Sequence, residues 1–324
     1  MNPAFSVIFF TTASGAGFGL FAWLGLLAIT NHLPGRLPAG IALVVGAVFA
    51  TAGLLSSIGH LGQPTRAWRA FSQWRSSWLS REGVLAVACF LPALWLGWLI
   101  WRANPAEVIA PGALVATASM RIAGAMLCVL ALATIACTAM IYASLKPVPA
   151  WRHPLVVPVY LGFALFTGGL LCLSVFGSRS FGVDGRADAL PAVLVLAGAV
   201  ALALLKILAW RFVDGGRSPA SRNSALGLPH ARPVHVFERP HTEANYLLRE
   251  MGYVLARKHA RKLRLAAVIL FAAAPALCML TVLLGPSPVL GIAAPVALSF
   301  ALAGALVERW LFFAEARHLV TLYY

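Results

Sequence analysis

Long apolar stretches alternate with short polar connections along the chain. A membrane-spanning helix needs about 20 mostly apolar residues, because each residue adds ~1.5 Å and the hydrocarbon core is ~30 Å thick. Eight stretches reach this length, and the pattern predicts an all-α, polytopic integral membrane bundle of eight transmembrane helices. The stretches cover roughly residues 6–30, 38–61, 82–101, 115–145, 154–177, 189–212, 264–285 and 288–311.

The composition also indicates an integral membrane protein. The chain has 324 residues, of which 60% are apolar and 11% charged, and its mean hydropathy is +0.84. Soluble domains are roughly 45–50% apolar and about 25% charged, so a soluble fold of this size would lack a charged surface. We expect one membrane domain over residues 1–324. The first stretch is too long for a cleavable signal peptide, so we expect it to remain in the membrane.

The basic residues predict an orientation. With eight spans, both termini share a side with loops 62–81, 146–153 and 213–263. This side holds 19 of the 25 Lys and Arg residues when Arg211, Arg264 and Arg309 are counted at helix ends. The positive-inside rule then predicts cytoplasmic termini, in a bacterial inner membrane. We expect the net charge of +15 to meet anionic lipid rather than nucleic acid.

One cation lies inside an apolar stretch. Lys206 belongs to the sixth stretch, and we expect its side chain to snorkel toward the Arg211 end of that helix. The remaining cations belong to the opposite loops: Arg36, Arg102, Arg121, Arg179 and Arg186.

The longest connection, residues 213–263, is basic and has two parts. Gly and Pro residues interrupt it up to about residue 241. From Thr242 the apolar positions follow a helical period, and cations gather near residue 260. We expect a cytoplasmic loop that ends in an interfacial helix at about 242–263, with its cations at the lipid headgroups. A solvated linker is the alternative.

Polar side chains gather at one membrane edge, between the second and third stretches. Residues 60–82 include one His, one carboxylate, four Arg and three Trp. Each also has an ordinary explanation, because the tryptophans suit an interfacial belt and the arginines suit a cytoplasmic loop. Ser80 suits a helix N-cap, and Glu82 suits the first turn of a helix.

Taken together, these residues predict a quinone site. His60 and Glu82 lie at facing ends of neighbouring helices, in reach of one amphipathic ligand at headgroup depth. A quinone has an apolar tail and a ring whose two-electron chemistry moves two protons, which an imidazole and a carboxyl are suited to exchange. Ser80 and Arg81 complete the predicted site. The candidates for docking a partner protein are Arg66, Trp68, Arg69 and Arg75.

Other redox and transport functions remain as alternatives. The five cysteines are scattered in apolar stretches without C-x-x-C spacing, so we expect no iron–sulfur cluster and no metal in this chain. A haem-b cytochrome needs paired histidines on facing helices, and only His60 is close to a span. A secondary transporter needs charges or broken helices at mid-depth, and the eight stretches offer few.

Several short motifs are shared with a known family. They are NPAFSVIF at residues 2–9, GAGFG at 15–19, HLG at 60–62, RAWR at 66–69, SWLSRE at 77–82, MIYA at 140–143 and ARKHA at 256–260. In these motifs the chain resembles the dimethyl sulfoxide reductase membrane-anchor family, over essentially its whole length. The glycines at 15, 17 and 19 then form a close-packing face rather than a nucleotide-binding loop, because no strand precedes them.

The resemblance implies the third subunit of a molybdenum enzyme complex. Its partners would be a molybdopterin catalytic subunit and a four-cluster iron–sulfur subunit. In that family a His and a Glu at the positions of His60 and Glu82 are implicated in menaquinol binding.

Two kinds of anchor look similar and differ in the direction of electron flow. Dimethyl sulfoxide reductase anchors oxidise menaquinol, whereas sulfite dehydrogenase anchors deliver electrons to a quinone and serve a cytoplasmic catalytic module. The predicted cytoplasmic placement of His60 favours the sulfite-oxidising kind. The quinone would be menaquinone or ubiquinone.

Overall fold

The structure is a computed structural model, and it confirms the eight-span helical bundle. It describes residues 4–59, 61–103, 108–109, 113–177, 189–215, 221–228, 232–235, 237–238, 258–284 and 290–322. Within these ranges, eight helices are long and apolar enough to cross a membrane. They are α1 (Phe5–Ile29), α2 (Arg36–Ile58), α3 (Trp78–Arg102), α4 (Ala118–Ala143), α5 (Val156–Phe176), α6 (Ala189–Gly215), α10 (Ala260–Val268) continued through the π turn η4 (Ile269–Ala273) into α11 (Ala274–Leu284), and α12 (Leu290–Ala314).

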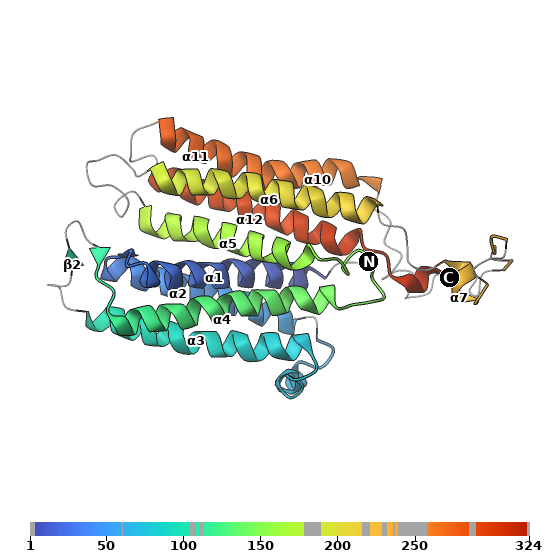
Figure 1. Ribbon diagram of the computed structural model, residues 1–324, viewed down its shortest axis with the longest axis horizontal. Helices are drawn as coiled ribbons and strands as arrows, with labels where there is room; N and C mark the ends of the chain where they lie inside the picture. The colour runs from blue at the N-terminus through green and yellow to red at the C-terminus, as the bar shows by residue number, and fades with distance from the viewer. Residues whose placement is uncertain are drawn as a thin grey trace.

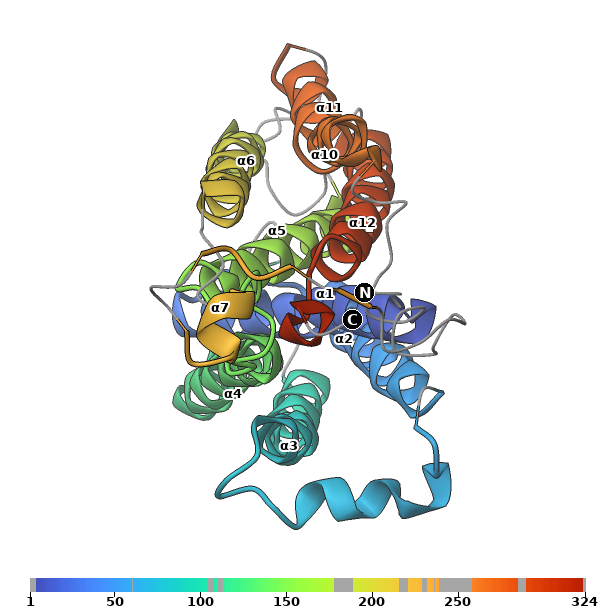
Figure 2. The same cartoon turned by 90° about the vertical axis from the view of Figure 1, so that its right-hand side faces the viewer.

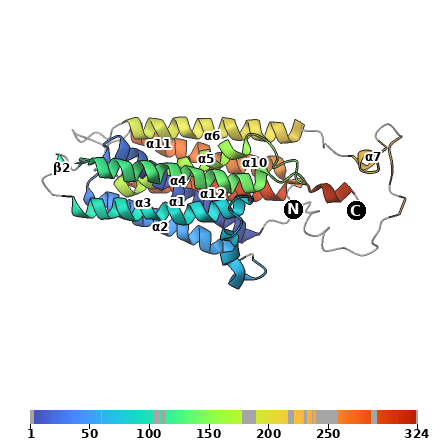
Figure 3. The same ribbon diagram turned by 60° about the horizontal axis from the view of Figure 1, so that its bottom comes forward.

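The bundle has two distinct ends (Figures 1 and 3). One end, which we call the η1 end, carries both chain termini, η1 (Pro64–Phe71), the 144–155 connection, α7 (Arg222–Ala225) and η6 (Leu319–Leu322). The other end, the sheet end, carries a small antiparallel sheet in the order β1-β3-β2. Its strands are β1 (Leu33–Pro34), β2 (Val108–Ile109) and β3 (Ala113–Leu114). Both termini lie at one end, as an even number of spans requires.

Seen along the helices, the bundle consists of two groups that meet in the middle (Figure 2). One apolar core joins α1, α2, α3, α4 and one face of α5. A second core joins the other face of α5 to α6, α11 and α12. Helix α5 therefore connects the two groups, and α1 packs beside it in the centre.

Helix α1 approaches three neighbours so closely that only glycine fits. A Cβ atom on Gly17 would lie 2.4 Å from the backbone of Ala50 in α2, and one on Gly25 would lie 2.3 Å from the backbone of Gly124 in α4. At Gly19 the carbonyl oxygen of Ala164 in α5 would be only 1.8 Å away. The expected close packing is thus confirmed for Gly17 and Gly19 but not for Gly15, whose Cβ atom would make an ordinary contact, and Gly25 adds a close approach that was not predicted. Small residues let membrane helices pack backbone against backbone.

The predicted interfacial helix over 242–263 falls mostly outside the described residues. Residues 258–263 are described, and α10 begins there at Ala260.

The close contact of α1 with α5 gives a direct test of the packing. We expect Gly19→Ala to lower the melting temperature of the detergent-solubilised protein, because overpacking costs about 1–3 kcal/mol and the new Cβ meets backbone that cannot rotate away. Gly15→Ala is the matched control on the same helix, since its Cβ would meet its nearest neighbour at an ordinary 3.8 Å. Equal melting temperatures for the two variants would contradict the packing described.

Candidate functional site

Helix α3 begins at the η1 end with a serine cap. Ser77 has an extended backbone, and its side chain accepts the backbone N–H of Ser80. The prediction of Ser80 as the N-cap is therefore wrong by one turn, because the helix starts earlier than its apolar pattern does. Ser80 instead lies inside the first turn, with 2% of its surface exposed.

Glu82 points into the bundle. It lies on the same helix face as the buried Ala86 and Cys89, and only 4% of its surface is exposed. Its Oε1 accepts a hydrogen bond of 2.5 Å from the hydroxyl of Thr138 on α4. Glu82 is thus deeper than the first-turn position predicted for it, ~6 Å along α3 from Trp78. Among the described residues it forms no ion pair with a cation.

The Thr138 hydroxyl suits both protonation states of this carboxyl. It lies 2.5 Å from Glu82 Oε1 and 3.1 Å from the backbone carbonyl oxygen of Thr134. A hydroxyl has one hydrogen and can also accept. It can donate to an ionised Glu82, or donate to Thr134 while accepting the proton of a neutral Glu82. Glu82 can therefore gain or lose a proton without leaving this hydroxyl unpaired.

Arg81 fixes the turn before α3. Its Nε and Nη2 donate to the backbone carbonyls of Trp74 (3.0 Å) and Arg75 (2.6 Å), and its guanidinium lies 4.3 Å from the ring centre of Trp78. The side chain of Arg81 is thus bound to the turn, while the next residue, Glu82, points into the bundle.

The predicted docking residues form an outward-facing basic surface at the η1 end. Arg66, Trp68 and Arg69 are exposed on η1, and Arg75 is exposed on the turn that follows. The guanidinium of Arg69 lies 5.7 Å from the ring of Trp68, an arrangement that keeps the charge in water above an aromatic surface. His60, the remaining predicted site residue, lies outside the described residues, between the end of α2 and Leu61.

Thr138 also lines an internal cavity, which we call cavity 1. The cavity lies between α1, α4, α5 and α12 and leaves about 20 Å³ in which the centre of a water molecule fits. That is enough for a water and too small for a quinone ring. The lining mixes polar and apolar side chains: Thr11, Thr12, Ser14, Gly15, Phe18, Ile135, Thr138, Tyr160, Phe163, Ala164, Thr167, Ala305 and Arg309.

A buried ion cluster lies between α6 and α12. Lys206 Nζ pairs with Glu308 Oε1, and Arg309 pairs with Glu308 Oε2 at 2.5 Å. All three side chains are at most 5% exposed. The prediction that Lys206 snorkels is therefore wrong, because Glu308 provides a partner inside the bundle. The placement of Arg309 at a helix end is wrong as well, since its apolar stretch stops near residue 311 whereas α12 continues to Ala314.

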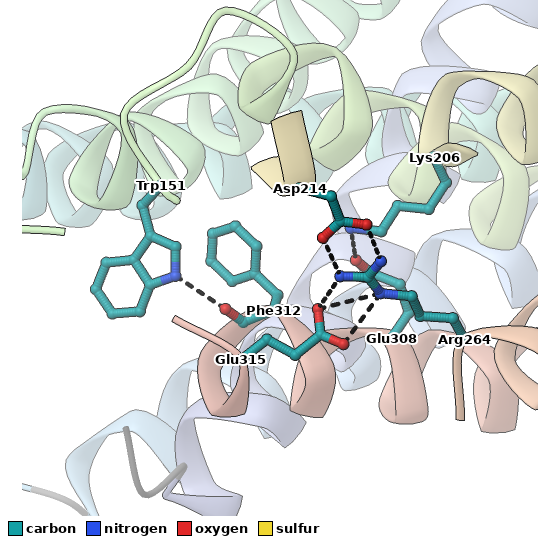
Figure 4. Close-up of polar contacts among 7 residues, drawn as sticks. All are labelled: Trp151, Lys206, Asp214, Arg264, Glu308, Phe312 and Glu315. Atoms are coloured by element: carbon teal, nitrogen blue, oxygen red, sulfur yellow. Dashed lines mark hydrogen bonds and ion pairs between the residues drawn. The ribbon is translucent and has the colours of Figure 1, made fainter. Parts of the chain in front are cut away.

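A second ion network closes the η1 end of the same helices (Figure 4). Arg264 on α10 pairs with Asp214 on α6 at 2.5 Å and with Glu315, directly after α12, at 2.8 Å. Cavity 2 lies between this network and the ion cluster. It offers about 30 Å³ to the centres of water molecules, and its polar lining residues are His153, Lys206, Trp210 and Glu315.

Within the described residues, no group of three or more His, Cys, Asp or Glu side chains could hold a metal ion. The five cysteines are free thiols that lie buried or half-buried in separate parts of the bundle.

Comparison with known proteins gives a consistent family. Residues 1–314 match the family described as DMSO reductase anchor subunit (DmsC). The chain is also 32% identical to a subunit of sulfite dehydrogenase from Allochromatium vinosum, over 100% of this chain and 99% of that protein.

His153, in the 144–155 connection, makes stability depend on pH. Burial, together with the nearby charge of Lys206, lowers its pKa from 6.5 to about 4. The folded protein thus holds the imidazole neutral where the unfolded chain would protonate it, so stability is complete above about pH 6.5 and falls as the pH drops toward 4. We expect wild-type protein to lose more melting temperature between pH 7.5 and pH 5 than His153→Gln does. An equal loss in both would contradict this role.

Proposed function

The chain belongs to the DMSO reductase anchor subunit family, and from this premise we propose that it anchors a molybdenum oxidoreductase complex in the membrane and exchanges electrons between quinone and an iron–sulfur partner. In this proposal the redox centres belong to a molybdopterin catalytic subunit and an iron–sulfur subunit. This chain provides membrane attachment, a place for the quinone ring and a path for protons.

The observation that carries the proposal is the buried carboxyl of Glu82. An ionisable group inside a membrane bundle is costly, and it marks a functional site by default. Glu82 lies ~6 Å inside the η1 end of α3, at the depth of a quinone ring whose tail extends into the acyl chains. Its partner Thr138 accommodates either protonation state. These properties suit a group that exchanges a proton with a bound quinone.

We place the ring near the start of α3, beneath the segment that joins α2 to α3. Phe71 packs against this start, because its ring would lie 3.3 Å from a Cβ atom on Gly83. Leu79 is 50% exposed on the outer face of α3 and can contact a lipid or an isoprenoid tail. His60, two residues beyond the end of α2 at Ile58, is the second proposed ring contact.

The proton chemistry follows from these groups. Quinol oxidation releases two protons with its two electrons, and quinone reduction takes both up. Glu82 would accept one proton from the quinol or give one to the reduced ring, and His60 would handle the other. Thr138 reorients its hydroxyl in step with Glu82, so the pair keeps a hydrogen bond throughout.

The similarity to a sulfite dehydrogenase protein favours one direction of electron flow. A sulfite-oxidising complex delivers electrons to quinone, so Glu82 would then be a proton donor. We also propose that the η1 end faces the cytoplasm, because it carries the exposed cations of η1 and α10.

The site is tested by Glu82→Gln in the intact complex. The amide keeps the size of the side chain and can still contact Thr138, but it exchanges no proton. Since a positioned general acid or base typically contributes 10²–10⁴-fold, we expect quinone-linked turnover to fall at least about a hundredfold. His60→Gln should lower turnover in the same assay.

The controls separate chemistry from assembly. Glu238→Gln, at an exposed loop position, should leave turnover unchanged, and membrane-bound catalytic activity with an artificial electron acceptor should persist in every variant. Wild-type turnover of Glu82→Gln would overturn the proposed site.

The basic surface of η1 is tested by reversing its charge. Combining Arg66→Glu with Arg69→Glu should release the soluble subunits from the membrane, and more of them at high salt, because exposed charge pairs are screened within ~8–10 Å at physiological ionic strength. Arg121→Glu, exposed at the sheet end, is the matched control. Retention of the soluble subunits by the double variant in 0.5–1 M salt (roughly a 3–4 Å screening length) would show that the partner docks elsewhere.

A further inference from the structure

The ion cluster of Lys206, Glu308 and Arg309 has no part in the function proposed so far, although it must be expensive to keep. Removing charges from water is costly unless they are paired and hydrogen-bonded, and in a membrane bundle such groups mark pathways for ions or protons. The cluster is also incompletely paired. Arg309 Nη1 makes no hydrogen bond among the described residues.

The unpaired atoms around Arg309 share cavity 1. The hydroxyls of Thr12 and Tyr160 are buried, line this cavity and, like Arg309 Nη1, lack a hydrogen-bond partner within the described ranges. Buried polar groups are normally satisfied by protein or by ordered water. The cavity has room for a water and offers it several polar neighbours, which are the two requirements for an internal water site.

Ion pairs and cavity 2 lead from cavity 1 toward the surface. Glu308 links the two cavities, because its Oε2 pairs with Arg309 of cavity 1 and its Oε1 pairs with Lys206 of cavity 2. Cavity 2 is closed by Glu315, which pairs with Arg264. Arg264 also pairs with Asp214, whose side chain is 57% exposed (Figure 4).

We propose that these groups form a proton route, from the surface at Asp214 through cavity 2, the ion cluster and cavity 1 to Glu82. The route rests on the proposed role of Glu82 and is separate from the path by which the quinone arrives. A proton moves from water in cavity 2 to Lys206 and from Lys206 to Glu308. It then reaches water in cavity 1 past the side chain of Arg309, which pairs with Glu308 and lines that cavity. That water gives a proton to the hydroxyl of Thr138, which passes its own proton to Glu82, and the sequence runs backward when Glu82 releases one.

Lys206 is the member of the cluster that can exchange its proton. Arg309 keeps its charge in proteins and by itself balances Glu308. A charged Lys206 gives the cluster a net positive charge, whereas a neutral Lys206 leaves a balanced Arg309–Glu308 pair. The cluster therefore stays intact in both states of Lys206.

The test compares two substitutions of Lys206 in the intact complex. Lys206→Met removes the exchangeable proton, and Lys206→Arg keeps the charge and the pair with Glu308 but does not release a proton. We expect both to lower quinone-linked turnover about tenfold or more and to raise the solvent deuterium isotope effect, while the dissociation constant of a quinone analogue stays unchanged. Lys262→Met, at an exposed position of α10, is the control.

The cavity provides an independent second test. Thr12→Val removes a hydroxyl from cavity 1 without changing the size of the side chain, and it should also slow turnover and raise the isotope effect. Thr281→Val is the control, because the hydroxyl of Thr281 donates to the carbonyl of Cys278 on its own helix and lines neither cavity. The comparison of Thr12→Val with its control tests the proton route if neither Lys206 variant assembles into the complex.

The outcomes separate the route from the quinone site. Wild-type turnover in Lys206→Met, or recovery of wild-type turnover and isotope effect in Lys206→Arg, would overturn the route and show that Lys206 is structural. If the Lys206 variants do not assemble, wild-type turnover in Thr12→Val would overturn it. In each case a slow Glu82→Gln would leave the quinone site in place.

Discussion

The close approach of α1 to its neighbours is the contact on which the rest of this bundle depends. Within the bilayer there is no hydrophobic drive to bring helices together, so association relies on packing and on polar contacts. Gly17, Gly19 and Gly25 bring α1 against α2, α5 and α4 in turn. Because α1 is fixed in the centre, its hydroxyl residue Thr12 comes to face the side chains of α4, α5 and α12 across cavity 1.

The polar chemistry of the molecule lies in one band near the η1 end. At ~1.5 Å per residue, Glu82, Thr138, Glu308 and Lys206 are all within ~14 Å of the ends of their helices at that side. The sheet end contrasts with this band: two of its described cations, Arg36 and Arg102, stack on Trp101 and Trp98, as in an interfacial aromatic belt. The asymmetry fits a protein whose polar chemistry takes place at one side of the membrane.

The sequence predicted the eight spans because hydrophobic length is a one-dimensional property. The close-packing face expected with the family resemblance holds at Gly17 and Gly19, but not at Gly15, and it did not include Gly25. The sequence drew attention to Glu82 because a lone acid near an apolar stretch is conspicuous, and the structure places that carboxyl inside the bundle. The sequence did not find Thr138 or the partner of Lys206. These pairings, between α3 and α4 and between α6 and α12, depend on how each helix is rotated about its axis. In helices that are apolar on all sides, the periodicity of the sequence does not specify that rotation. The sequence argument against a transporter was that charges at mid-depth are missing, and the buried ion cluster removes that argument. The anchor function rests on the family instead.

A quinone site within a membrane must admit both a quinone and protons, and the two require opposite surroundings. The quinone arrives through lipid and needs an apolar approach, whereas protons need water or a chain of polar groups. In the proposed site Glu82 would lie on the boundary between the two, since α3 presents Leu79 to the outside and the carboxyl to α4. Thr138 is the one described hydrogen-bond partner of that carboxyl, and it also lines cavity 1. A single hydroxyl can thus connect the lipid side to the water side while the helices on either side of it remain closely packed.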